Sequence, residues 1–315
     1  MQEIKKIFAD TGLEVKEFSN IETFYNSVTK IHTDKGNFFV KKYNDRTGYK
    51  LSNLYPMLEK QGLPVPRVLK YDDSCQIINQ PYLIISQVNG KMLCATELND
   101  EKQFYYDLGQ ILARIHSITF GSFGETFDGK TIENYQGIRP SKTWKGMYEE
   151  IIKKRLQNLE KSDFEDLIKP INEWFQKNFH LLDYKITPRL LHEDLNQKNI
   201  FVKDNRISGI IDFDGSFVGH NEEELMRTEG ANFSGNDFRQ VFLEGYTRFI
   251  PLDQGYAKRR RFYYLSRLLV HIHCVIQNGE DYVGNLKKEE NILREEIDKI
   301  INHKEINFDK NRVNT

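Results

Sequence analysis

The segment Leu190–Gly215, LLHEDLNQKNIFVKDNRISGIIDFDG, is the feature that most constrains the fold and chemistry of this chain. It places His192, Asp194, Asn199 and Asp212 among apolar runs. Burying a carboxylate or an amide is costly unless a partner satisfies it. A metal ion and a chain of phosphates would together satisfy these polar groups.

Two strand-like runs, NIFVK and ISGIID, flank a DNR segment whose Asp and Asn suit a turn. Paired residues in an antiparallel ladder have a constant sum of residue numbers. In the absence of a bulge, Asn199 therefore lies opposite Asp212 at the open end of this hairpin. A carboxylate and an amide oxygen, completed by phosphate oxygens, suit Mg²⁺. The hairpin predicts a Mg²⁺ site formed by Asn199 and Asp212.

Asp194 lies five residues before Asn199, in a loop that follows the apolar run RLL. From that loop its carboxylate can accept a proton from an attacking hydroxyl, or orient it, beside metal-bound phosphates. We expect His192 to fix the loop by hydrogen bonding and to take no part in the chemistry. The alternative interpretation is that Asp194, Asn199 and Asp212 are only turn formers.

These residues carry a resemblance to a known family. The H-x-D-x-x-x-x-N pattern in HEDLNQKN, followed by IIDFD, resembles the aminoglycoside phosphotransferase and choline kinase family, relatives of the protein kinases. PYLIISQVNGKML is similar to the family's inter-lobe strand and hinge, DLGQILARIHSI to its first large-lobe helix, GLPVPRVL to the stretch after its small-lobe helix, and GHNEEEL to its G-D-P-x-x-D-L. Each segment alone is weak evidence for the family, but their occurrence in this order is specific to it.

The resemblance implies an α+β, two-lobed, protein-kinase-like fold, and the chain pattern agrees with it. At 315 residues the chain exceeds the roughly 250–300 residues of a single core. Residues 1 to about 85 are mostly strand-like, with one helix before Gly62, and after residue 98 the apolar spacing becomes helical. The helical spacing covers about 104–115, 144–159, 163–182, 236–250 and 258–302. We expect a nucleotide-binding lobe at 1–88, a catalytic and acceptor-binding lobe at 89–302 and a polar tail at 303–315.

The resemblance also implies a nucleotide site for ATP or GTP. Lys41 in NFFVKKY would pair with the α- and β-phosphates, and Lys42 is the alternative, because neighbouring strand residues point to opposite faces. The adenine would meet the backbone around Ser86, Gln87 and Val88.

The expected phosphate-covering loop departs from the kinase pattern. The segment FSNIETFYNS has no glycine, although glycine lets backbone N–H groups approach phosphates closely. Short polar side chains would have to substitute, namely Ser19, Asn20, Asn26 and Ser27.

The helix that follows departs as well. The position that would give a glutamate to the strand lysine falls near Leu51, and RTGYKLSNLY contains no acid. Glu59 lies two turns further on and is expected to be solvated. Lys41 would then be held by Asp212 or by phosphate alone. Weak ATP use, another nucleoside triphosphate and a degenerate site all remain open.

The family phosphorylates hydroxyls of small molecules, many of them cationic, and nearby acids would support a cationic acceptor. In HNEEELMRTEG, Glu222 and Glu229 are either acceptor contacts or, in the favoured interpretation, solvent-facing charges, and Glu224 is expected to be structural. Three tyrosines could enclose a quaternary ammonium but at their spacing are more often core: Tyr256, Tyr263 and Tyr264.

Composition excludes several classes. The chain is 39% hydrophobic with a net charge of −1, which is typical of a folded protein and argues against nucleic acid as the main partner. The one dense basic run, Arg259–Arg261, is expected on a solvated helix face. The three cysteines form no C-x-x-C pair, and there is neither a signal peptide nor a run of about 18 apolar residues. We expect a cytoplasmic protein with no membrane anchor.

The sequence therefore predicts a Mg²⁺-dependent small-molecule kinase with Asp194 as base, Asn199 and Asp212 as metal ligands and Lys41 as phosphate clamp. The main alternative is a kinase-fold binding or assembly protein without turnover, similar to the kinase-shaped spore coat proteins. A protein-substrate kinase is disfavoured, because no segment resembles the DFG to APE activation region.

Overall fold

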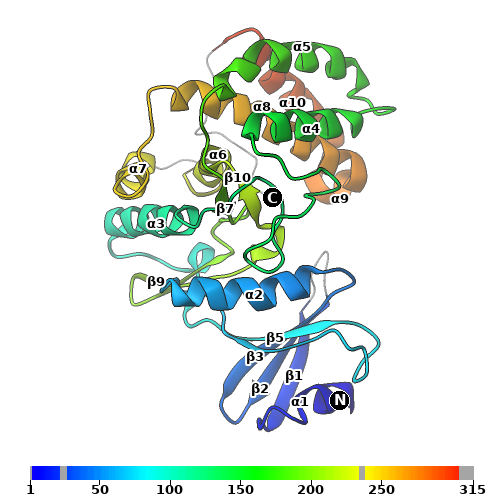
Figure 1. Cartoon of the computed structure of the whole chain (residues 1–315), viewed down its shortest axis with the longest axis vertical. Helices are drawn as coiled ribbons and strands as arrows, with labels where there is room; N and C mark the ends of the chain where they lie inside the picture. The colour runs from blue at the N-terminus through cyan, green and yellow to red at the C-terminus, as the bar shows by residue number, and fades with distance from the viewer. Residues whose placement is uncertain (1, 22–26, 234–237, 305–315) are drawn as a thin grey trace. The chain divides into compact units, whose positions relative to one another are not determined.

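The computed structural model describes residues 2–21, 27–233 and 238–304. The chain forms two compact units. Unit 1 comprises Met1–Phe104, Thr126–Glu133 and Gln197–Gly215, and unit 2 comprises Tyr105–Glu125, Asn134–Asn196 and Ser216–Thr315. Figure 1 shows an antiparallel sheet in the N-terminal part and mostly helices after it, which confirms the predicted α+β class.

Unit 1 is built on a five-stranded antiparallel sheet in the order β1-β2-β3-β5-β4. Its strands are β1 (Val15–Ile21), β2 (Ser27–Thr33), β3 (Gly36–Lys42), β4 (Val68–Asp72) and β5 (Tyr82–Ser86). The segment DKG lies at the turn between β2 and β3, where Thr33 pairs with Gly36.

Two helices accompany this sheet. The first, α1 (Gln2–Phe8), packs its apolar side chains against the face that carries Ile31, Val40 and Ile84. It is missing from the sequence prediction, which treated residues 1 to 85 as mostly strand-like. The second, α2 (Thr47–Lys60), packs on β4 and β5 and was predicted. It contains Pro56 without ending there, and its leucines at helical spacing are buried.

A second sheet in unit 1, in the order β6-β8-β9, holds the predicted metal-site hairpin. It is formed by β6 (Lys91–Met92), β8 (Ile200–Lys203) and β9 (Arg206–Ile210). Asp204 and Asn205 close the hairpin with positive φ values of 52° and 58°, which suits a tight two-residue turn. Short 3-10 turns, η1 (Leu93–Ala95) and η4 (Phe213–Gly215), follow β6 and β9.

The pairing at the open end of this hairpin corrects the sequence prediction. The turn pairs Lys203 with Arg206, so the hairpin is centred between Asp204 and Asn205, one residue earlier than assumed. Ser208 of β9 is the extra residue of a bulge opposite Phe201 and Val202, which shifts the register by one. Asn199 is consequently opposite Ile211, whose N–H donates to the Asn199 carbonyl at 3.0 Å. Asp212 follows one residue later with φ 69°. The predicted pairing of Asn199 with Asp212 was therefore wrong by one residue, because the turn moves the partner back by two residues and the bulge returns one of them.

Unit 2 is mostly helical and carries one small antiparallel sheet, β7 (Arg189–Leu191) with β10 (Phe217–Gly219). Its helices are α3 (Glu101–His116, in unit 2 from residue 105), α4 (Trp144–Gln157), α5 (Ile168–Asn178), α6 (Asn221–Asn232), α7 (Arg239–Thr247), α8 (Tyr256–Asn278), α9 (Glu280–Val283) and α10 (Leu286–Ile301). The 3-10 turns η2 (Glu165–Leu167) and η3 (Phe179–Leu182) flank α5.

Two helical predictions needed correction in their extent. The helix expected over about 163–182 is split into η2, α5 and η3. The stripe from 258 to 302 is broken at Gly279 and Gly284, which have φ values of 58° and 71°. Glycine tolerates this left-handed region, so it can end one helix and let the next begin at another angle.

The core of unit 2 lies around α8, which packs on α4, α6 and α10. As expected, Tyr256, Tyr263 and Tyr264 are buried. The hydroxyl of Tyr263 also accepts a hydrogen bond from the indole N–H of Trp144 at 2.9 Å. These tyrosines hold helices together and are not arranged as an exposed cation cage.

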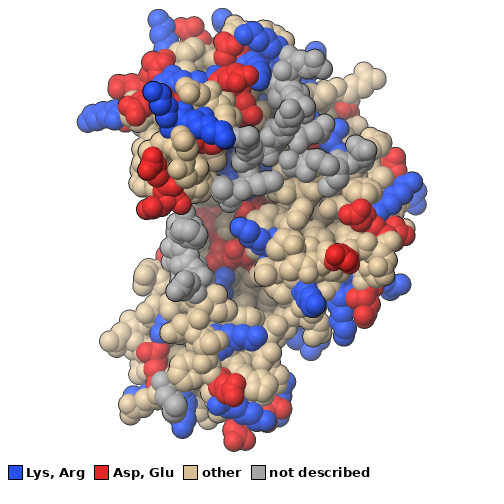
Figure 2. All heavy atoms as spheres, turned by 180° about the vertical axis from the view of Figure 1, so that it is seen from behind, with Lys and Arg blue, Asp and Glu red and all other residues tan. Residues whose placement is uncertain are grey.

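On the face shown in Figure 2, lysine and arginine side chains alternate with aspartate and glutamate, in line with the near-neutral charge of the chain. Within the part of the chain that the structure describes, none of the helices combines the length and the apolar character needed to span a bilayer.

Candidate active site

In unit 1, β3 carries two neighbouring lysines to opposite faces of the sheet. Lys41 Nζ lies 2.9 Å from Asp214 Oδ1 and 3.4 Å from Asp212 Oδ1. Lys42 instead forms an ion pair with Glu3 of α1. Because Lys42 shares its face with Val40, it points to the side of the sheet that α1 covers. Strand alternation therefore assigns Lys41, and not Lys42, to the acidic segment after β9.

Electrostatics keep Lys41 charged. Burial alone would lower the pKa of the Lys41 ammonium, but the Asp214 carboxylate outweighs that effect and the pKa lies well above its ordinary value. Burial raises the pKa of Asp214, which the Lys41 charge opposes and the neighbouring Asp212 reinforces. The three groups form one tightly linked cluster.

Asp214 is a site residue that the sequence analysis missed, although it is the second acid of IIDFDG. Its backbone is fastened as well as its side chain, because Lys50 Nζ of α2 donates to the Asp214 carbonyl at 2.6 Å. Lys50 is only 2% exposed, and the adjacent Leu51 is fully buried. Glu59 is exposed and bonds Arg67 at 2.8 Å, as its predicted solvated position implies. Near the position where a glutamate was expected, α2 thus sends a lysine towards the site.

Asn199 and Asp212 have the donor types that fit a magnesium ion, namely an amide oxygen and a carboxylate. Asn199 is buried next to β8, whereas the Asp212 side chain is 43% exposed. Among the described residues, no group of three or more His, Cys, Asp or Glu side chains could hold a metal by itself. A site of two protein ligands completed by phosphate oxygens is compatible with this composition, because Mg²⁺ usually keeps non-protein ligands.

The hinge candidates stand at the end of β5. The Ser86 N–H donates to the Arg67 carbonyl at 2.8 Å, and the Gln87 N–H donates to the Asn37 carbonyl at 2.9 Å. These two N–H groups therefore already donate to backbone carbonyls within unit 1. Val88 packs closely on β9, because a Cβ added to Gly209 would lie 2.6 Å from the Val88 Cβ.

The expected phosphate loop is only partly described. Residues 22–26, and Asn26 with them, lie outside the described residues. Ser19 and Asn20 belong to β1 and Ser27 begins β2. Asn20 Oδ1 accepts a hydrogen bond from the Thr29 hydroxyl at 3.0 Å.

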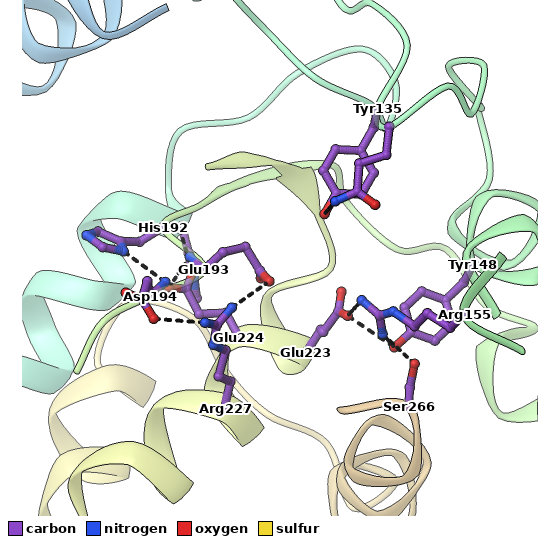
Figure 3. A network of polar contacts seen from close by, with 12 residues as sticks. Tyr135, Tyr148, Arg155, His192, Glu193, Asp194, Glu223, Glu224, Arg227 and Ser266 are labelled. Atoms are coloured by element: carbon purple, nitrogen blue, oxygen red, sulfur yellow. Dashed lines mark hydrogen bonds and ion pairs between the residues drawn. The ribbon is translucent and has the colours of Figure 1, made fainter. Parts of the chain in front are cut away.

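In unit 2, the HED segment directly follows β7, and Glu224 of α6 binds its backbone (Figure 3). The two oxygens of Glu224 accept the backbone N–H groups of His192 at 2.8 Å and of Glu193 at 2.9 Å. The same carboxylate lies 2.8 Å from His116 Nε2, and burial acts against its charge, but these partners still lower the pKa of Glu224. The predicted structural role of Glu224 is confirmed.

His192 also behaves as predicted. Its Nδ1 accepts a hydrogen bond from the Asp194 backbone N–H at 3.0 Å, so the imidazole shapes the loop. Glu193 between them has φ 71°, a left-handed conformation that is uncommon for a residue with a side chain. The loop is therefore strained at one residue and fixed on both sides of it.

Arg227 of α6 contacts the acids of this loop (Figure 3). Its Nη2 donates to Asp194 Oδ1 at 2.8 Å, and its Nη1 lies 3.4 Å from Glu193 Oε2. The Asp194 side chain is 38% exposed, whereas Glu193 is buried. Burial raises the pKa of Glu193, the nearby Glu223 raises it further, and Arg227 opposes both.

A second arginine continues this polar layer. Arg155 of α4 lies 3.5 Å from Glu223 Oε1 and also contacts the Ser266 hydroxyl, and Tyr148 donates to Glu223 Oε1 at 3.1 Å (Figure 3). Burial raises the pKa of Glu223 in spite of Arg155. Isolated sequence motifs give no sign of this layer, because its members come from α4, α6, α8 and the loop after β7.

The favoured interpretation of Glu222 and Glu229 as solvent-facing charges was wrong. They are only 4% and 2% exposed, and each is paired with arginine. Arg259 Nε donates to Glu222 at 2.6 Å, and Arg239 Nε donates to Glu229 at 2.6 Å. Arg259 and Arg260 are consequently buried, so the basic run is not a solvated face. Buried charges need such partners, and both glutamates are held within unit 2.

Comparison with known proteins identifies the family of the chain. A family model described as "Phosphotransferase enzyme family" matches residues 18–262. A protein of Vibrio cholerae named "Probable ketoamine kinase" is 28% identical over 264 residues, which is 80% of this chain and 83% of the relative. Another of that name from Enterococcus faecium is 24% identical over 300 residues, with 89% and 96% coverage.

A solved structure has the same fold. A thermostable mutant of the aminoglycoside phosphotransferase APH(4)-Ia, in a ternary complex with AMP-PNP and hygromycin B, superposes with a TM-score of 0.70 at 16% identity, covering 95% of this chain and 97% of that one. The resemblance drawn from HEDLNQKN and IIDFD is thereby confirmed. The chain belongs to the phosphotransferase enzyme family.

Proposed function

We propose that this chain transfers the γ-phosphoryl group of ATP or GTP, with Mg²⁺, to a hydroxyl of a ketoamine, the amino ketone that forms when the adduct of a reducing sugar and an amine rearranges. The observation that carries the nucleotide half of the proposal is the approach of Lys41 Nζ to Asp212 at 3.4 Å. The two residues are 171 positions apart in the chain, and the pairing joins the strand lysine to the proposed metal ligand.

The proposed roles follow from the chemistry of each side chain. Asp194 accepts or orients the proton of the attacking hydroxyl, and its partly exposed carboxylate supports that role. Asn199 and Asp212 hold Mg²⁺, which supplies charge neutralisation on the phosphates when it is bound. Lys41 binds the α- and β-phosphates. Positioning and charge neutralisation would provide most of the rate enhancement.

The hydrogen bonds at the end of β5 narrow the nucleotide proposal. The N–H groups of Ser86 and Gln87 already donate to Arg67 and Asn37. We assign the backbone N–H of Val88 as the group that donates a hydrogen bond to the adenine or guanine base. Its side chain lies against Gly209, and this packing fixes the backbone at that point.

The names of two relatives support a ketoamine as acceptor. A ketoamine carries several hydroxyls and an amine that can be protonated, so it also meets the expectation of a cationic acceptor. The burial and arginine pairing of Glu222 and Glu229 argue against those two residues as the groups that bind the cation. Glu193, beside Asp194, is also buried and contacts Arg227 at 3.4 Å, so it is not assigned to the cation either.

The experiment is a transfer assay with the full chain. Ketoamines of sugars with small amines, the parent sugars, the free amines and hygromycin B are each incubated with MgATP or MgGTP, and products are scored for one added phosphoryl group by mass. We expect product with a ketoamine and none with its free amine. If hygromycin B were the only acceptor to give product, the proposed kinase activity would stand but the proposal of a ketoamine acceptor would be refuted.

One observation favours the alternative, a kinase-fold binding or assembly protein without turnover. Leu51 is fully buried where an acid was expected, and the neighbouring Lys50 is basic. The same assay separates the two proposals. Nucleotide binding without any phosphorylated product or hydrolysis across the panel would support the alternative.

A further inference from the structure

The cluster formed by Lys41, Lys50 and Asp214 lies wholly within unit 1 and contains an unusual pairing. Two lysines from different elements, β3 and α2, meet a single aspartate in the η4 turn. One lysine contacts its carboxylate at 2.9 Å and the other contacts its carbonyl at 2.6 Å. The first distance lies within the range of charge-assisted hydrogen bonds and the second is shorter, so the two contacts fix the side chain and the backbone of the aspartate.

We propose that Asp214 is the positioning residue for Lys41, and that Lys50 fastens the turn that carries Asp214. This inference rests on the proposed function in one respect, namely that Lys41 is the phosphate-binding lysine. Asp214 acts through Lys41 and is not assigned to the metal or to the reacting atoms.

Geometry favours Asp214 over Asp212 as the holder of the lysine. Lys41 Nζ is 0.5 Å closer to Asp214 (2.9 Å) than to Asp212 (3.4 Å). The Asp214 side chain is 21% exposed and that of Asp212 43%, so the first pair is the more sheltered from solvent. An ion pair weakens as solvent screens it, and the sheltered partner therefore dominates. Asp212 is left as the more accessible carboxylate, which suits its proposed contact with Mg²⁺.

The surroundings of the cluster hold it in one arrangement. Tyr55 of α2 packs edge-on against Phe213, with ring centroids 5.9 Å apart, next to the Asp214 turn. Lys41 Nζ lies 5.8 Å above the ring of Tyr43. Lys50 is almost fully buried, so its hydrogen bond to the Asp214 carbonyl is sheltered from solvent. The helix α2 thus acts on the strand lysine indirectly, through a lysine and a turn.

The first test measures Lys41 itself and needs no enzymatic activity. Only a neutral amine reacts with an acylating reagent, so a carboxylate partner slows the labelling of a lysine. In the full chain, Asp214→Asn is expected to raise the acylation rate of Lys41, measured by mass spectrometry of its peptide, by about tenfold, which corresponds to one pKa unit. Lys50→Met is expected to give a change of the same direction, and the double variant should add little to Asp214→Asn.

Matched controls are available in the same elements. Lys42→Met removes the neighbouring lysine of β3, which pairs with Glu3, and Glu59→Gln alters the exposed side of α2. Both should leave Lys41 labelling unchanged. Thermal unfolding of each variant checks the fold, and Asp214→Ser replaces Asp214→Asn if the latter does not fold. An unchanged Lys41 rate in a folded Asp214 variant overturns the proposal.

The second test uses steady-state kinetics with ATP and an acceptor from the panel. A positioning role predicts that Asp214→Asn raises the KM for ATP by about tenfold while the acceptor KM changes by less than about twofold. The Mg²⁺ concentration for half-maximal rate should stay the same. A raised Mg²⁺ requirement with unchanged Lys41 labelling would identify Asp214 as a metal ligand and contradict the proposal. If the chain transfers no phosphate, the labelling result still decides the inference, so the two failures are distinguishable.

Discussion

Arg227 of α6 donates from Nη2 to Asp194 Oδ1 at 2.8 Å, which ties the proposed catalytic carboxylate to a helix. The loop is also held by His192, by the two backbone contacts to Glu224 and by Asn232, which donates to the Leu195 carbonyl at 2.8 Å. A carboxylate that must orient a hydroxyl has to be held in a narrow geometry. Arg227 supplies part of that constraint.

Replacing Arg227 should therefore impair the chemical step. We expect Arg227→Met to lower kcat by roughly one to two orders of magnitude, with a smaller change in the KM for ATP. Arg248 is an exposed arginine just after α7, so Arg248→Met is the control and should have a kcat close to that of the parent. Equal kcat values for Arg227→Met and the parent in a coupled transfer assay would show that the ion pair has no part in positioning.

The buried Glu229 gives a stability prediction. Arg239 and Arg260 each approach Glu229 Oε2 at 2.6 Å, and Tyr256 donates to its other oxygen at 2.5 Å. Glu229→Ala leaves these groups without their partner, so the free energy of unfolding should fall by roughly 3–5 kcal/mol. Denaturant unfolding measures this loss, and the exposed Glu244→Ala serves as the control with a change within about 0.5 kcal/mol.

The same variant separates structure from acceptor binding. If Glu229 were an acceptor contact, a conservative Glu229→Gln would raise the acceptor KM with little effect on unfolding. We predict instead that Glu229→Gln lowers the free energy of unfolding and has little effect on the acceptor KM, because protein partners enclose the carboxylate.

Glu193 should make stability depend on pH. Burial raises its pKa from 4.5 to about 8. Between about pH 5 and pH 8 the folded chain then binds a proton that the unfolded chain has released, so the free energy of unfolding falls as the pH rises. Removing this group with Glu193→Gln should flatten the fall by at most about 1.4 kcal/mol per pH unit. Denaturant unfolding at several pH values tests the slope, and an identical slope in parent and variant would contradict the assignment.

Much of this site could be predicted from the sequence, because its signals are local. The turn residues Asp204 and Asn205 and the apolar runs beside them indicate the hairpin. Strand alternation separates Lys41 from Lys42 once β3 is known. The sequence does not show that the turn is centred between Asp204 and Asn205, nor that Ser208 forms a bulge, so the partner of Asn199 was misplaced by one residue.

The ion pairs between residues far apart in the chain could not be predicted from the sequence. Glu222 and Glu229 match the pattern of solvated helix charges, since glutamate is almost never buried unless it is paired. Their partners Arg259, Arg260 and Arg239 come from α8 and α7, and nothing in the local pattern announces the match. For the same reason Asp214 was passed over. Its significance depends on Lys50, which is 164 positions away.

A close backbone contact in unit 1 gives a further prediction. Gly90 has φ 97°, and a Cβ at this position would lie 2.2 Å from the Val202 carbonyl oxygen of β8. Gly90→Ala should therefore destabilise the β6-β8-β9 sheet, lowering the free energy of unfolding by roughly 2 kcal/mol or more. Gly121→Ala, which meets no atom within 4 Å, is the matched control. Similar melting temperatures for the two variants would show that the sheet can relax around the added methyl.

The most direct test of the account is phosphoryl transfer by Asp194→Asn, measured beside its binding of MgATP. The variant keeps the size of the side chain but cannot accept the hydroxyl proton. We predict that kcat falls by roughly two orders of magnitude or more while the Kd for MgATP stays within about twofold. An Asp194→Asn variant that phosphorylates the acceptor at the parent rate would contradict the proposed mechanism.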